Sequence, residues 1–168
     1  MFEDKDYDYR IRVFKVQLFY LMHRRKKWGF NLLLQPQIQF AKHQLLNPYF
    51  ISPDIPNYEE LRDLYTQEKN LTLYQLEIGF QLRAALWKQI YFETTVGLGA
   101  GFINRATERL AKGFTFIENF SVGLAYQLKT KELYLGTNIG HVSSFNTQKP
   151  NDGYNVLGFE LGYRILLN

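Results

Sequence analysis

His141 and Ser143 are the residues of this chain whose types and spacing best fit a catalytic site. They lie in residues 132–143, where apolar and polar side chains alternate as in a β-strand. Successive side chains of a strand point to opposite faces, so both residues face the same way, with Cα atoms roughly 6.6 Å apart at ~3.3 Å per residue. Over that distance an imidazole can take the proton of a serine hydroxyl. The pair therefore predicts activated-serine chemistry.

The face that holds this pair is otherwise apolar, since it also carries Leu133, Leu135 and Ile139. A nucleophile and a base on an apolar face are unusual for an enzyme that acts on a water-soluble substrate. The pattern therefore predicts that the substrate is a lipid.

Seven segments alternate with period two, and each is predicted to form a β-strand. They are residues 9–22, 28–40, 71–83, 89–102, 114–128, 132–143 and 155–167. The first is less regular than the others and switches register near Val13. All are longer than the ~5–6 residues usual in soluble sheets, and they suit tilted strands that cross a bilayer in ~9–11 residues and have interfacial ends.

The two faces of these strands differ in chemistry: one is apolar, and the other carries Gln, Glu, Arg, Asn, Thr and Gly. A soluble sandwich would turn its apolar faces inward, whereas a membrane barrel would turn them toward lipid and fill its interior with polar side chains. Periodicity alone fits both folds, but strand length, terminal aromatic residues and amides on the polar face favour the barrel. Glu118 disagrees with the pattern, because it shares a register with Phe116 and Phe120 on the apolar face.

The connections between the strands predict the topology. Short turns at residues 23–27, 84–86 and 129–131 alternate with longer loops at residues 41–70, 104–112 and 144–154, as in outer-membrane barrels. We therefore predict an all-β fold in which residues 1–168 form one antiparallel up-and-down transmembrane β-barrel. The loop 41–70 is predicted to be external and to contain a short helix at residues 58–65. Because bacterial single-chain barrels have an even number of strands, we expect the first strand and a signal peptide to be missing from the chain, unless loop 41–70 hides a strand.

Composition excludes several other classes of site. The chain has no cysteine, so it can form neither a disulfide nor a thiolate metal site. Its three histidines, His23, His43 and His141, lack the spacing of metal ligands, and we expect no metal and no cofactor. The formal net charge of +4 is spread along the chain and is too small to argue for nucleic acid.

Three features together resemble the PagL-type lipid A 3-O-deacylases, a family of eight-stranded outer-membrane barrels. They are the His-Val-Ser tripeptide at 141–143, the segment Pro-Asn-Asp-Gly-Tyr-Asn that ends at Asn155, and the alternating C-terminal strand. The resemblance implies a serine esterase of the bacterial outer membrane with lipid A or lipopolysaccharide as substrate and membrane lipids around it. It implies that Ser143 attacks an ester-linked 3-hydroxyacyl chain, that His141 is the base, and that the residue at position 155 orients His141.

The chain departs from the family pattern at two positions. Ser144 stands where the family has an oxyanion-stabilising Asn, and Asn155 stands where the family has Glu. We predict His141, Ser143 and Asn155 as catalytic residues and Ser144 and Asn146 as supporting residues. Asp152 and Asn146 are alternative partners for His141 from the loop.

Two other functions remain open at the level of the sequence. A catalytically silent barrel that binds lipid would have the same strands but no turnover. A soluble lipocalin-like binder would place the apolar face inside, around a ligand. The sequence also leaves open whether the protein is a monomer or a homodimer.

Overall fold

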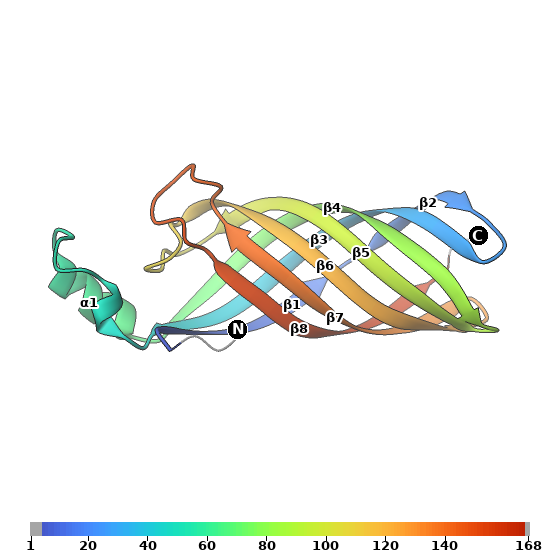
Figure 1. The fold of residues 1–168 in the computed structure, drawn as a ribbon, viewed down its shortest axis with the longest axis horizontal. Coiled ribbons are helices and arrows are strands. Elements are labelled where there is room, and N and C mark those ends of the chain that lie inside the picture. The colour runs from blue at the N-terminus through green and yellow to red at the C-terminus, as the bar shows by residue number, and fades with distance from the viewer. Residues whose placement is uncertain (1–4, 167–168) are drawn as a thin grey trace.

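The computed structural model describes residues 5–166, which fold almost entirely into antiparallel β-strands (Figure 1). The strands are β1 (Tyr7–Lys15), β2 (Leu18–Arg24), β3 (Trp28–Leu45), β4 (Lys69–Trp87), β5 (Ile90–Ile103), β6 (Gly113–Leu128), β7 (Lys131–Ser143) and β8 (Tyr154–Ile165). A 3₁₀-helix η1 (Pro48–Phe50) and a helix α1 (Tyr58–Thr66) lie between β3 and β4. The predicted all-β fold and the predicted short helix are confirmed.

The sheet curls into a nearly closed barrel in which consecutive strands from β2 to β8 are also neighbours in the sheet (Figure 1). The strand order is β1-β3-β4-β5-β6-β7-β8, and β2 pairs with β3 as well. β1 pairs with residues 37–45 of β3 and β2 with residues 29–34, so the two short strands share one position in the barrel. The up-and-down topology is therefore confirmed, with seven strand positions.

The predicted single first strand, residues 9–22, is wrong in one respect: it is interrupted at Val16 and Gln17. Val16 N–H donates to the carbonyl of Pro36 at 3.0 Å. In an antiparallel ladder, a residue's N–H and C=O point to the same neighbour, so Pro36 would return a bond to Val16 if it had an N–H. Proline has none, and the ladder is broken at this point.

Three loop boundaries also differ from the prediction. β3 and β4 extend into the predicted loop 41–70, so that residues 46–68 connect them. β4 continues through the predicted turn 84–86, because Ala85 still pairs with Tyr91 and Trp87 with Ile90. The last strand starts at Tyr154 and is described to Ile165, and the predicted end at Leu167 lies outside the described residues.

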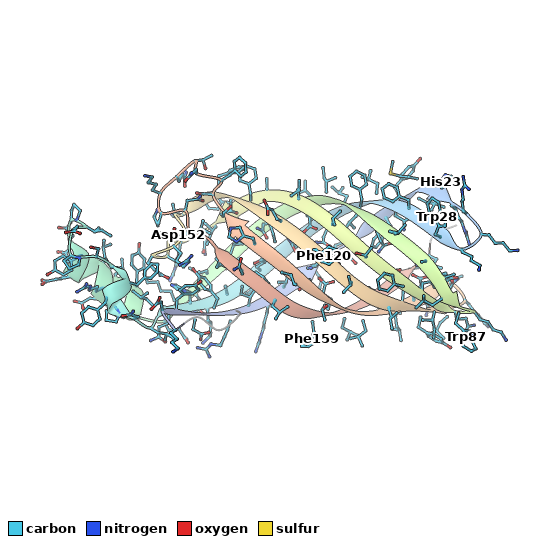
Figure 2. All side chains as sticks on the ribbon, viewed as in Figure 1. His23, Trp28, Trp87, Phe120, Asp152 and Phe159 are labelled. Carbon is cyan, nitrogen blue, oxygen red and sulfur yellow. The ribbon has the colours of Figure 1, made fainter. Side chains whose placement is uncertain are left out.

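The outer face of the barrel is apolar. Phe159 and Leu161 of β8 are 91% and 85% exposed, and Figure 2 shows Phe120 and Phe159 on the outside of the strands, between the two ends of the barrel. Trp28 and Trp87 lie at the end opposite α1 (Figure 2) and are also exposed, as in the aromatic belts of membrane proteins. This orientation is the one predicted for a membrane barrel and is the reverse of a soluble sandwich.

The interior contains two layers. Toward the end that carries α1, an apolar cluster is formed by Ala41, Leu71, Leu73, Ile103, Leu110, Ile117, Val142, Tyr154 and Val156. Farther along the barrel the side chains are polar: Gln35 and Gln37 donate to buried Glu77, and Arg83 and Arg164 form ion pairs with Glu93 and Glu132. The polar faces of the strands therefore meet each other inside the barrel, where buried charges are paired.

The two ends of the sheet order, β1 and β8, are connected by side chains. Within residues 5–166 no ladder joins these two strands. The rings of Tyr9 and Tyr154 stack with centroids 4.3 Å apart, and Lys15 forms an ion pair with Glu160. The additional first strand, which was expected because bacterial barrels have an even number of strands, stays a prediction. Within the same residues, no helix is long and apolar enough to cross a membrane.

Candidate active site

Two neighbouring strands, β7 and β8, present the predicted catalytic residues on the outer face, near the end of the barrel that carries α1 (Figure 1). His141 of β7 lies directly opposite Asn155 of β8 on one side and Glu118 of β6 on the other. Ser143 is the last residue of β7 and pairs with Phe116 of β6. The side chains of directly paired residues lie side by side on the same face of a sheet, so His141, Asn155 and Glu118 form one row across it.

His141 and Asn155 are joined by a hydrogen bond. The distance from His141 Nδ1 to Asn155 Oδ1 is 2.8 Å. An amide oxygen can only accept, so Nδ1 carries the proton in this arrangement and Nε2 keeps a free lone pair. This is the tautomer that a histidine needs to accept a proton from a serine hydroxyl.

His141 and Ser143 share the outer face, and both are half-buried. Among the described residues no hydrogen bond joins their side chains, and the only side-chain hydrogen bond of His141 is the one to Asn155. A serine–histidine contact often tightens only when the substrate is bound. The structure thus brings together the three residues predicted as catalytic, while their roles stay predictions.

Gly153 lets the loop between β7 and β8 approach His141 closely. Its φ of +64° lies in the left-handed region, which favours glycine. A Cβ atom added here would overlap the carbonyl oxygen of Val142 and would lie 3.0 Å from both Cε1 and Nε2 of His141. The main chain at Gly153 therefore packs against the imidazole, on the side of the free Nε2.

The inward-facing neighbours of the site support it from inside the barrel. Val142 lies between His141 and Ser143 in the chain, and Tyr154 and Val156 flank Asn155. All three are buried in the apolar cluster of the barrel interior. A site that is built on strands above a packed layer is held in position more precisely than a site on loops.

The predicted supporting residues, Ser144 and Asn146, lie in the β7–β8 loop and form hydrogen bonds within it. Ser144 is fully buried, its N–H and hydroxyl both contact Asn151 Oδ1, and its hydroxyl also donates to the carbonyl of Gln148 at 2.9 Å. Asn146 has a φ of +61° and accepts from Asn151 Nδ2 at 3.3 Å. These contacts hold the loop together, and an oxyanion role of Ser144 or Asn146 would have to compete with them.

Arg109 contacts the site region in a way that the sequence did not predict. Its Nε donates to the carbonyl of Gly153 at 2.7 Å, and Gly153 N–H donates back to the carbonyl of Arg109 at 3.1 Å. Asp152 is labelled at this end of the barrel in Figure 2, and its main-chain carbonyl accepts a hydrogen bond from Arg109. Among the described residues, Asp152 forms no hydrogen bond with His141. The β5–β6 loop therefore fixes the segment that precedes Asn155. No local pattern could have indicated this, because Arg109 and Gly153 are 44 residues apart.

An aromatic wall borders Ser143. The rings of Phe114 and Phe116 meet edge to face with centroids 4.8 Å apart, and Phe145 lies 5.4 Å from Phe116. Because Phe116 pairs with Ser143 across the strands, this wall lies directly beside the serine. Such a surface suits an acyl chain. No group of metal-ligating side chains occurs within residues 5–166.

Comparison with known protein families identified a match over most of the strands. The family model described as Lipid A 3-O-deacylase (PagL) matches residues 57–164, which is more than half of the chain and includes Glu118, His141, Ser143 and Asn155. No curated protein and no solved structure matches.

Proposed function

The chain belongs to the lipid A 3-O-deacylase (PagL) family, and on that basis we propose that it is a serine esterase of the bacterial outer membrane that removes an ester-linked 3-hydroxyacyl chain from lipid A. The observation that carries the proposal is the grouping of Ser143, His141 and Asn155 on the apolar outer face, with the Nδ1–Oδ1 hydrogen bond that leaves Nε2 of His141 free.

The location of the site fits a lipid that stays in the membrane. The surrounding outer surface is apolar, with Ile139 and Leu157 exposed on the same strands as His141 and Asn155. An acyl chain in the outer leaflet could lie along this surface and against the Phe114–Phe116–Phe145 wall while its ester reaches Ser143. The substrate would then not need to leave the bilayer.

In the proposed reaction, Ser143 Oγ attacks the acyl carbonyl and passes its proton to Nε2 of His141. The tetrahedral intermediate collapses, and the sugar oxygen leaves with the proton from His141. Water then attacks the acyl-serine with His141 again as the base, which releases the fatty acid and restores the serine. Asn155 keeps the imidazole in the required tautomer throughout.

Mass spectrometry of lipid A tests this proposal. Lipid A in detergent micelles is incubated with refolded protein or with the Ser143→Ala variant. We expect the wild type to remove the mass of one hydroxyacyl chain and Ser143→Ala to remove none, with both proteins showing the heat-dependent gel migration of a folded barrel. An active Ser143→Ala variant would exclude Ser143 as the nucleophile. A folded but inactive wild type would favour the silent lipid-binding barrel, for which the uncharged Asn155 is the supporting observation.

A further inference from the structure

We infer that Glu118 is a positioning residue for His141 and supplies the negative charge that Asn155 lacks. The inference rests on the proposed serine-esterase function and adds to it a residue that neither the catalytic motif nor the alternation of the strands identified as functional.

The register of the sheet places Glu118 beside His141. The two residues are Cα partners in the β6–β7 ladder, and both side chains point outward. Directly opposite residues of an antiparallel pair have Cβ atoms ~4.5–5.5 Å apart, which is within reach of a glutamate side chain. Asn155 occupies the other side of His141, so the histidine lies between an amide and a carboxylate.

The other surroundings of Glu118 are apolar. On its second side it pairs with Leu98 of β5, and on its own strand the outward neighbours are Phe116 and Phe120. Among the described residues its carboxylate forms no hydrogen bond or ion pair. A carboxylate on the lipid-facing side of a barrel is unfavourable, so a residue that only completed the outer face would be apolar. His141 is the one polar side chain among these cross-strand and same-face neighbours.

The chemistry of the site requires a negative charge at this position. When Ser143 loses its proton to Nε2, His141 becomes an imidazolium. Asn155 accepts the Nδ1 hydrogen bond but is neutral, so it orients the ring without compensating the new charge. The carboxylate of Glu118 stabilises the imidazolium through space in an environment with little water, where such an interaction is strong. Asn155 therefore orients His141 while Glu118 supplies the negative charge, and together the two residues do what a single acidic residue would do.

The labelling rate of Ser143 with a fluorophosphonate tests this inference, because the probe reports an activated serine whatever its natural substrate is. Ser143 Oγ attacks phosphorus, fluoride leaves, and His141 takes the serine proton. We expect Glu118→Gln and Glu118→Leu each to slow labelling by about 10- to 30-fold, the difference between a charged and a neutral partner. Glu118→Leu is expected to fold at least as well as the wild type, because leucine suits the apolar outer face.

Moving the charge to the other side of His141 distinguishes an electrostatic role from a structural one. In the double variant Glu118→Gln, Asn155→Glu, the carboxylate lies on β8 in place of β6, and we expect labelling to return to within about threefold of wild type. Loss of a merely structural contact at position 118 would not be repaired from the opposite strand. Glu60→Gln removes one exposed carboxylate from α1, outside the three strands that carry the site, and should leave the rate unchanged.

The results separate this inference from the proposed function. Ser143-dependent labelling that falls in the position 118 variants and returns in the double variant supports the inference even if lipid A is not deacylated. Labelling at the wild-type rate in both position 118 variants overturns it, as does a double variant that stays slow. Absence of labelling in the folded wild type would overturn both, because no activated serine would then exist.

Discussion

Gly153→Ala should reduce the catalytic rate of this barrel while still allowing it to fold. The methyl group would overlap the Val142 carbonyl oxygen and would lie 3.0 Å from Nε2 of His141. Nε2 is the atom that must receive the proton of Ser143. The variant therefore displaces the base from the serine without removing any functional group.

Two effects determine how much the Gly153→Ala variant loses in stability and in catalytic rate. The left-handed φ of +64° costs an alanine roughly 1–2 kcal/mol relative to glycine, and relief of the overlap with the main-chain carbonyl oxygen of Val142 lowers the free energy of unfolding further. To relieve the overlap, the imidazole or the loop must move by roughly 1 Å, and a displacement of that size can reduce the rate of the chemical step about 100-fold. We therefore expect a large loss of kcat in a barrel that still folds but is less stable than the wild type.

Gly113→Ala is the matched control. Gly113 also has a positive φ, +129°, but a Cβ there would meet the flexible side chain of Gln148, 2.9 Å away, and not His141. Lipid A deacylation is measured by mass spectrometry under single-turnover conditions, and unfolding is measured by urea titration in lipid vesicles. Gly113→Ala should lose stability while its turnover stays within about threefold of wild type. The reasoning is refuted if Gly153→Ala keeps wild-type turnover, or if the two variants lose turnover equally.

Two further predictions concern the barrel interior. Tyr154→Phe should leave the free energy of unfolding unchanged or raise it by up to about 1 kcal/mol, because the buried Tyr154 hydroxyl has no hydrogen-bond partner among residues 5–166. A decrease of more than about 1 kcal/mol in urea titration would show that the hydroxyl is hydrogen-bonded. Glu132→Gln should lower the free energy of unfolding by about 2–3 kcal/mol, because it leaves Arg83 and Arg164 to share Glu93. This loss is smaller than the ~3–5 kcal/mol expected for a fully buried pair, because the two arginine side chains are 17% and 12% exposed. An unchanged urea midpoint for Glu132→Gln, beside the exposed control Glu60→Gln, would contradict this.

The alternation of side chains was predictable because it is local. Residues two apart in a strand share a face whatever the partner strand is. Gln35, Gln37 and Gln39, for example, share the polar face of the predicted strand 28–40, and all three are buried. Length and amide content then favoured a barrel with these residues inside, which the structure confirms.

The ends and breaks of strands were less predictable, because they depend on the neighbouring strand. β4 continues to Trp87 only because β5 extends to Ile90 beside it. The interruption at Val16 results from the missing N–H of Pro36, which is 20 residues away in the chain and adjacent only in the sheet. Neither partner could be identified from the local pattern.

In the candidate site, too, some features were predictable from the local sequence pattern and others depended on the tertiary structure. The sequence by itself determined that His141 and Ser143 share an apolar face, because the strand period fixes this over three residues, and resemblance to a family pointed to position 155. Only the tertiary structure decided that Glu118 lies opposite His141 and that Arg109 holds the main chain at Gly153 against it. These neighbours are set by the register between strands and by the contact between loops, and both depend on the closure of the whole sheet, whereas the alternation within a strand needs only the geometry of the chain itself.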